Sequence, residues 1–174
     1  MKLSSLKVYL GELNHTAIGD LRIAASDLGL VAVEWADSQP ELIEYLFRLN
    51  ATVEHNQKAI HVYAKELGEY LKGKRHEFTF AIDWGTLKPF QQKALKAVYA
   101  VPYGETQTYT DIAMQIGHPH ASRAVGRANA TNPMPIIIPC HRLIGKDGKL
   151  HGYGGGDGLP TKEWLLKLEG ATMA

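Results

Sequence analysis

The hydrophobic pattern begins with short apolar runs and later changes to helical repeats. Three early runs mix β-branched and aromatic residues and predict strands over 6–10, 20–25 and 30–35. Glycine and aspartate residues between these runs are turn signals. Together the three strands predict a short antiparallel sheet.

Helical spacing appears after Pro40, which suits the first turn of a helix over 41–49. Between 55 and 72, apolar residues recur every three or four positions and predict a second helix. Alternating phenylalanines then predict another strand over 78–82. No motif for chemistry occurs in this half, so we interpret it as a supporting α/β domain.

The pattern changes again near residue 84, and we expect two domains, 1–84 and 85–174. The second is predicted to be mainly helical, with helices starting near Pro89 and spanning about 111–116, 121–129 and 162–169. The middle two, joined by a tight turn, resemble a helix-turn-helix, although an ordinary helical hairpin gives the same pattern. The expected fold class is α+β: a small N-terminal α/β domain with a short antiparallel sheet plus helices, then a mainly helical C-terminal domain containing a helix-turn-helix.

Composition narrows the class of protein. No run of about 18 apolar residues occurs, so we expect no membrane partner. Residues 1–15 contain no uninterrupted apolar stretch or cleavage signal, so we do not expect secretion. A single cysteine in 174 residues excludes an internal disulfide and a zinc site built from several thiolates. The histidines are too scattered to predict a metal site. We expect a cytoplasmic protein, or a nuclear one in a eukaryote.

Charge is distributed unevenly along the chain. Residues 1–84 carry 9 Lys and Arg against 12 Asp and Glu, whereas residues 85–174 carry 10 against 6. No carboxylate occurs from Ile112 to Lys146, a stretch that includes three arginines. This pattern favours a basic surface that a polyanion could contact, although a solvated basic face is also common.

Cys140 is the candidate reactive group. Three isoleucines and Pro139 precede the thiol, and His141 and Arg142 follow it. A lone cysteine is often a small buried hydrophobe. The basic flanking residues instead favour a thiol biased toward thiolate, which is the nucleophilic form.

With these residues in place, the second half of the chain resembles the O6-alkylguanine-DNA alkyltransferases, also called methylated-DNA–protein-cysteine methyltransferases. The matching motifs occur in the family's order; they are Tyr103-Gly104-Glu105, Thr108-Tyr109, Ser122-Arg123-Ala124-Val125-Gly126, Asn132-Pro133, Ile138-Pro139-Cys140-His141-Arg142, Gly152-Tyr153, Lys162-Glu163-Trp164-Leu165-Leu166 and Glu169-Gly170. The first half matches only as the variable α/β domain that the family would have there.

The resemblance implies direct-reversal DNA repair by a monomer that needs no cofactor. Its partner would be double-stranded DNA containing O6-alkylguanine. The alkyl group would pass irreversibly from guanine to the protein's own cysteine after base flipping, so each molecule would act once.

Five catalytic roles are implied by the resemblance. Cys140 would be the nucleophile, activated by His141 through a bridging water, because adjacent side chains on an extended segment point apart. Glu169 would hold the imidazole. Asn132 would buttress the active-site turn, or simply cap a helix. Tyr109 would rotate the phosphate and protonate the departing guanine, or be structural.

The same resemblance assigns the second short helix to DNA. Arg123 would fill the place of the flipped nucleotide, with small neighbours close to the minor groove, although common helix-turn-helix geometry predicts the major groove. The residues expected at the DNA are Tyr109, Arg123, Ala124, Val125, Gly126 and Arg127. The residues expected around the alkylguanine are Pro135, Leu143, Tyr153, Gly154 and Lys162.

Two departures from the family pattern affect the pocket. Gly154 stands where some members carry a larger or hydroxyl residue, which predicts a roomier pocket. Asp157-Gly158 lengthens the glycine-rich loop, which could approach a ligand closely or be only a connector. The rival interpretations are a lesion-binding alkyltransferase-like protein, which would lack the nucleophilic cysteine, and a Cys-His hydrolase.

Overall fold

The computed structural model describes residues 4–171. The chain forms two compact units that divide between Thr86 and Leu87. A sheet with two helices makes up the first unit, and helices dominate the second, which confirms the expected α+β class.

The N-terminal unit is built on a four-stranded sheet in the order β3-β2-β1-β4. Strands β1 (Leu6–Thr16), β2 (Gly19–Ser26) and β3 (Gly29–Trp35) pair antiparallel, as the sequence predicts. Strand β4 (Ala51–His55) was not predicted, and it runs parallel to β1 at the sheet edge. Four of its five residues are exposed, so it shows no alternation that could reveal a strand.

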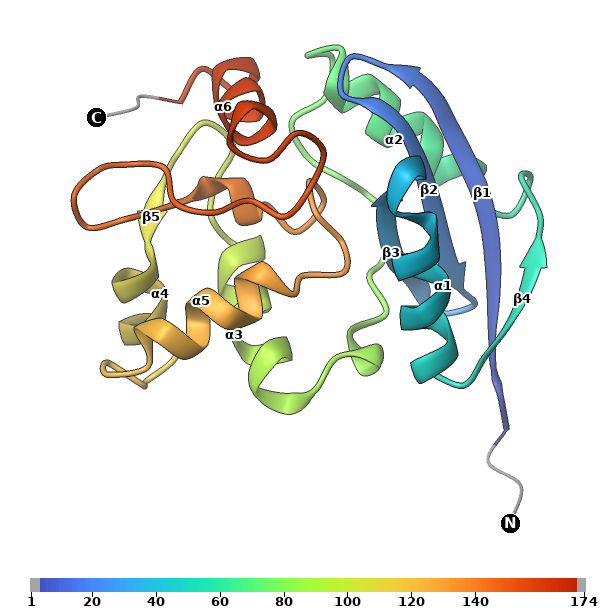
Figure 1. Cartoon of the computed structure of the whole chain (residues 1–174), viewed down its shortest axis with the longest axis horizontal. Helices are drawn as coiled ribbons and strands as arrows, with labels where there is room; N and C mark the ends of the chain where they lie inside the picture. Colours follow the sequence, from blue (N-terminus) through green and yellow to red (C-terminus); the bar gives the residue numbers. More distant parts are fainter. Residues whose placement is uncertain (1–3, 172–174) are drawn as a thin grey trace. The chain divides into compact units, whose positions relative to one another are not determined.

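Helices cover both faces of this sheet (Figure 1). Helix α1 (Gln39–Arg48) buries Leu42 and Leu46 in a core shared with Val8 and Leu10 of β1. Ile60 lies over Gly11 on the opposite face, just before helix α2 (His61–Leu71). The helix expected from residue 55 therefore starts at residue 61, because 51–55 joins the sheet.

The strand expected over 78–82 is not formed. Only Ile82 makes a bridge, to Leu30 of β3. Phe78 and Phe80 instead turn their rings toward tyrosines of α2. The buried carboxylate of Glu66 accepts hydrogen bonds from the backbone and hydroxyl of the intervening Thr79. The alternation in sequence thus reflects aromatic packing against a helix.

The C-terminal unit is mainly helical, as predicted. Its helices are α3 (Pro89–Tyr99), α4 (Tyr109–Gln115), α5 (Ser122–Ala130) and α6 (Leu159–Leu168). Two short strands, β5 (Gln107–Thr108) and β6 (Leu143–Ile144), pair parallel. Helix α6 begins earlier than the predicted residue 162, because Pro160 occupies its first turn.

The two short helices α4 and α5 pack against each other and against α3 (Figure 1). Thr108 and Asp111 form a reciprocal capping box that fixes the start of α4. After α4, Gly117 adopts a left-handed conformation (φ 78°), which turns the chain sharply toward α5. Sequence thus sets both ends of α4, and with them the placement of Tyr109 at its first position.

Candidate active site

Cys140 lies at the start of a 3₁₀ turn, Cys140–Arg142, that follows a buried apolar segment. Only 5% of the residue is exposed. Asn132 holds this segment from both ends: its Nδ2 donates to Ile138 O (2.9 Å) and its Oδ1 accepts from Met134 N (2.9 Å). The side chain thus braces the loop that delivers the thiol.

His141 and Glu169 form a buried pair beside the thiol. His141 Nε2 and Glu169 Oε1 lie 2.8 Å apart, and both side chains are fully buried. Burial alone would raise the pKa of Glu169, but hydrogen bonds from His141 and Arg142 outweigh it and hold that pKa well below its usual range. Because the carboxylate is ionised, Nε2 carries the proton and the lone pair of the neutral ring lies on Nδ1.

The pKa values of the thiol and the imidazole are shifted in opposite directions. Burial lowers the pKa of His141 more than Glu169 raises it, so the ring is neutral near pH 7 and able to accept a proton. Burial raises the pKa of Cys140, while a hydrogen bond from Asn132 and the charge of Lys162 partly oppose the rise. The thiol therefore needs a base, and the neutral imidazole of the next residue, His141, is the candidate.

Arg142 has a different place from the one the sequence suggested. We expected it to bias the thiol toward thiolate, but its guanidinium lies on Glu169 with Nε–Oε2 and Nη2–Oε1 distances of 3.0 and 2.9 Å. Its Nη1 donates to Val101 O. Arg142 thus keeps the carboxylate ionised, and it acts on the imidazole only through Glu169.

Lys162 is a buried cation that holds the backbone on both sides of residues 144–150. Its Nζ donates to Leu143 O (2.7 Å) and His151 O (2.8 Å). Burial lowers its pKa to about 8. The lysine thus joins α6 to both ends of the loop between Leu143 and His151.

Tyr109 and Arg123 meet at a surface pocket of about 340 Å³ between α4 and α5. Thr110, Ser122, Gly126 and Lys146 complete its lining. Arg123 and Lys146 make the pocket basic, which suits a phosphate or another anion.

The remaining residues of α5 that were expected at the DNA divide into two groups. Ala124 and Arg127 are exposed. Val125 is fully buried, so it supports the helix from beneath and does not contribute to the surface.

The residues expected around the alkylguanine differ in their burial. Pro135 and Leu143 are buried, Tyr153 is partly buried, and Gly154 is exposed. A Cβ built on Gly154 would meet only Ala130 O, at 3.9 Å, which is an ordinary contact. The glycine therefore leaves space that a side chain would occupy.

One site residue, Asn129 on α5, was missed by the sequence reasoning. Its Nδ2 donates to Cys140 O at 3.3 Å, and the residue is buried. An asparagine among small apolar residues on the inner face of a helix is the signal that could have revealed it, because a buried amide needs polar partners.

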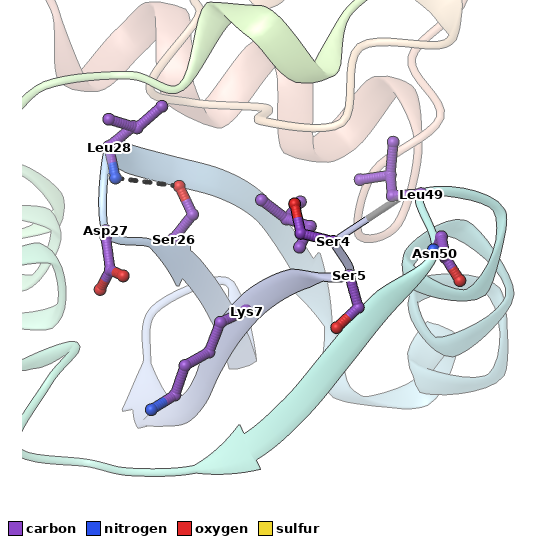
Figure 2. A pocket seen from close by; sticks show the side chains of 9 residues that line it. Ser4, Ser5, Lys7, Ser26, Asp27, Leu28, Leu49 and Asn50 are labelled. Carbon is purple, nitrogen blue, oxygen red and sulfur yellow. Dashed lines mark hydrogen bonds between the residues drawn. The ribbon is translucent and has the colours of Figure 1, made fainter. Parts of the chain in front are cut away.

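The N-terminal unit has a pocket of about 490 Å³ at the end of its sheet (Figure 2). Its lining comes from Ser4–Lys7, Ser26–Leu28 and Leu49–Asn50. Figure 2 shows the hydrogen bond that Leu28 N donates to Ser26 Oγ, in the turn between β2 and β3. No thiol or imidazole lines it, so the chemistry of Cys140 has no counterpart there.

Two findings concern residues 4–171 as a whole. No helix in this range is long and apolar enough to cross a membrane. Within the same residues, no group of three or more His, Cys, Asp or Glu side chains could hold a metal ion.

The fold and site define a two-unit protein in which a buried Cys-His-Glu arrangement adjoins a pair of short helices. Residues 9–84 match the family model described as "6-O-methylguanine DNA methyltransferase, ribonuclease-like domain". Residues 89–171 match the model described as "6-O-methylguanine DNA methyltransferase, DNA binding domain". The chain belongs to the 6-O-methylguanine DNA methyltransferase family, which confirms the resemblance seen in the sequence.

Individual relatives agree with this assignment. A methylated-DNA–protein-cysteine methyltransferase of Methanosarcina barkeri is 42% identical over 156 residues, which is 89% of this chain and 93% of the relative. The inducible enzyme of that name from Bacillus subtilis is 42% identical, covering 84% and 82%. The solved Mycobacterium tuberculosis O6-methylguanine methyltransferase is 38% identical with a TM-score of 0.76, over 94% and 93% of the two chains.

Proposed function

We propose that this protein repairs DNA by direct reversal, moving the alkyl group from O6 of guanine to its own Cys140. The observation that carries the proposal is the buried single cysteine of the chain, followed directly by a buried histidine whose Nε2 lies 2.8 Å from the ionised Glu169. The relatives' names support the activity. A solved relative, M. tuberculosis OGT in complex with DNA, is 36% identical with a TM-score of 0.75 over 95% and 93% of the two chains, and supports DNA as the partner.

The transfer requires one proton to be removed from the Cys140 thiol and one to be supplied to the departing guanine. A bridging water passes the thiol proton to His141 Nδ1, because Nε2 already donates to Glu169. The thiolate then attacks the alkyl carbon, and the carbon–O6 bond breaks with its electron pair moving onto the purine. Tyr109 donates a proton to the departing guanine. The resulting thioether is stable, so each molecule transfers once.

The target base must leave the duplex to reach a buried sulfur, at a cost of a few kcal/mol in lost stacking. The pocket of Arg123 and Lys146 would take the backbone phosphate beside the flipped nucleotide. Arg123, exposed on α5, would fill the space that the base vacates. Carbonyl oxygens of Cys140 and Leu143 would read the guanine amine, and the segment at Tyr153 would wall the alkyl group.

We assign different roles to the two halves of the chain. Residues 85–174 would bind O6-alkylguanine in double-stranded DNA and transfer the alkyl group, while residues 1–84 support them. The protein would act as a monomer in the cytoplasm, or in the nucleus of a eukaryote.

A mass measurement tests the proposed function. The protein is incubated with a duplex containing O6-methylguanine and then weighed intact. Transfer adds about 14 Da, one methylene, to each molecule and stops at one equivalent. Peptide mapping must place the gain on Cys140. Tight binding without a mass gain would instead indicate the lesion-binding alternative, and repeated turnover of an ester would indicate a hydrolase.

Replacing Arg123 by alanine should slow repair in duplex DNA much more than attack on free O6-methylguanine, because the arginine holds the extrahelical state and takes no part in the bond changes. Losing one positive charge at the DNA should also reduce the salt slope of binding, by up to about one unit. Single-turnover rates on both substrates and binding over a salt series measure these effects.

Arg75→Ala is the matched control, since this arginine pairs with Glu66 and Glu69 in the N-terminal unit. Equal losses on duplex and free base for Arg123→Ala would contradict the role proposed for the arginine.

A further inference from the structure

A tight turn at Tyr103-Gly104 joins helix α3 to strand β5 and takes no part in the proposed bond changes. The backbone N–H of Glu105 donates to Pro102 O (3.1 Å), which closes the turn. Gly104, at its third position, has a φ of 78°, a conformation that favours glycine. The residue types at this turn are therefore those that its backbone requires.

The turn contacts the C-terminal end of helix α6 through both of its central residues. Tyr103 Oη donates to Leu168 O (3.2 Å), one of the last carbonyls of the helix, which lack partners within it. Gly104 approaches the next residue so closely that a Cβ would lie 3.0 Å from Glu169 O. A side chain at position 104 would therefore push the turn away from the end of the helix.

The carboxylate of Glu169 lies where a helix disfavours negative charge. Glu169 directly follows α6, and the C-terminal end of a helix carries a partial negative charge. The backbone N–H of Gly104 donates to Oε2 at 3.3 Å, the oxygen that also accepts from Arg142 Nε. The other oxygen, Oε1, accepts from His141 Nε2. The turn thus holds one carboxylate oxygen while the other binds the imidazole.

The same segment also contacts the guanidinium that shares this carboxylate. Arg142 Cζ lies 5.8 Å from the centroid of the Tyr103 ring, within the range of a cation–π contact. Arg142 Nη1 donates to Val101 O. Burial raises the pKa of Tyr103, and the charge of Glu169 raises it further, so the phenol stays protonated and able to donate. Residues 101–104 therefore contact both members of the Arg142–Glu169 pair.

We propose that the Tyr103-Gly104 turn positions Glu169 for alkyl transfer: it holds the carboxylate in the orientation that binds the imidazole of His141. This inference rests on the proposed function and extends it to two positioning residues outside the Cys-His-Glu arrangement. Neither of them exchanges an atom or a proton in the reaction. A carboxylate that turns away from the imidazole stabilises the imidazolium less, so ionising the Cys140 thiol through His141 then requires a higher pH.

Replacing Gly104 by alanine should raise the pH at which Cys140 becomes reactive. The added methyl group moves the turn off the carboxylate, because φ is 78° and Glu169 O lies 3.0 Å from the new Cβ. The rate of alkylation by iodoacetamide, measured over a pH series, reports the thiolate and should rise at a pH higher by at least about 0.5 unit. Transfer from methylated duplex at pH 7 should slow about 10-fold, a small part of the roughly 10⁴-fold effect of losing an orienting carboxylate.

Gly117→Ala is the matched control for backbone strain. Gly117 has the same φ of 78°, but a Cβ there would meet no atom of residues 4–171 within 4 Å. This variant should lose stability in urea, because alanine is strained at positive φ. The pH dependence of Cys140 alkylation should stay within about 0.2 unit of that of the unchanged protein.

Two variants of Tyr103 separate the aromatic ring from the hydroxyl, and they test the inference if Gly104→Ala does not fold. Tyr103→Phe keeps the ring beside Arg142 and loses only the bond to Leu168 O, so transfer should stay within about threefold. Tyr103→Leu loses both contacts. It should slow transfer about 10-fold and shift the alkylation of Cys140 to higher pH, as Gly104→Ala does.

Two outcomes would overturn the inference. If Gly104→Ala and Tyr103→Leu lose stability but keep the pH dependence of alkylation, the turn is only a structural cap on α6. If Gly117→Ala shows an equal shift, general strain is the cause. Failure of the proposed function is distinguishable, since the unchanged protein would then gain no mass from methylated duplex, whereas alkylation by iodoacetamide needs no DNA.

Discussion

Replacing Cys140 by alanine abolishes alkyl transfer and leaves DNA binding close to that of the unchanged protein. The thiol is the chain's only one and supplies the bond that the alkyl group forms, whereas it contributes almost nothing to the exposed surface. Removing a small buried sulfur costs little packing, so the fold should persist. Intact mass after incubation with methylated duplex reports the transfer, and a binding titration on the same duplex reports affinity.

Cys140→Ser is the companion variant, because it keeps a hydroxyl of similar size that remains protonated near pH 7. It should also show no mass gain on the timescale of the unchanged protein. Any stoichiometric methylation of Cys140→Ala would show that another residue accepts the alkyl group, and the assignment of the nucleophile would then be wrong.

Glu169→Gln should have the second largest effect, because it damages stability and chemistry together. Losing the carboxylate leaves the buried guanidinium of Arg142 without its counter-charge, which costs about 3–5 kcal/mol of unfolding free energy. The amide can also donate to His141 Nε2 and so favour the wrong tautomer. Comparable losses of an orienting carboxylate reduce rates by up to about 10⁴-fold. Urea unfolding and single-turnover transfer measure the two effects.

Glu163→Gln on the same helix is the matched control. Its carboxylate pairs with Lys167 at 3.0 Å, but both side chains are largely exposed. Such a pair contributes about 0–1 kcal/mol, so stability and transfer should hardly change. If the two variants lost similar unfolding free energy and transfer rate, burial would not explain the contribution of the Glu169 network.

The same network predicts how stability depends on pH. The pKa of His141 is lower in the folded protein than its ordinary 6.5, and that of Glu169 is lower than its ordinary 4.5. In both cases the unfolded chain binds protons first, so stability falls as the pH drops below 6.5 and falls further below 4.5. Urea titrations from pH 7 to 4 should show both losses, and the lower one should be smaller in Glu169→Gln, where the other carboxylates with a lowered pKa still contribute.

Helical spacing and the turn and capping residues could be recognised in the sequence. Apolar residues at helical spacing predicted α3, and turn and capping residues predicted the pair α4 and α5. The run of isoleucines before Cys140 is buried, as apolar residues usually are. These features depend on neighbours in sequence, which is why the linear pattern contains them.

Features that depend on tertiary partners could not be predicted. Strand β4 is short and exposed, and only its pairing with β1 defines it. From the sequence, Arg142 was expected to act on the thiol. In the fold its guanidinium instead donates hydrogen bonds to Glu169, which is distant in sequence. Asn129 had no visible motif, since the Cys140 carbonyl that it contacts reaches it only through the fold.

The ammonium of Lys162 has a consequence for how this protein can diverge. Lys162 donates hydrogen bonds to the carbonyls of Leu143 and His151. These bonds hold the backbone just before Tyr153 in place, whatever residues follow that tyrosine. Insertions after Gly154, such as Asp157-Gly158, can then accumulate without dislodging the tyrosine. Lineages could therefore tailor which lesions they accept by lengthening or trimming this one stretch, while the reacting centre is inherited unaltered.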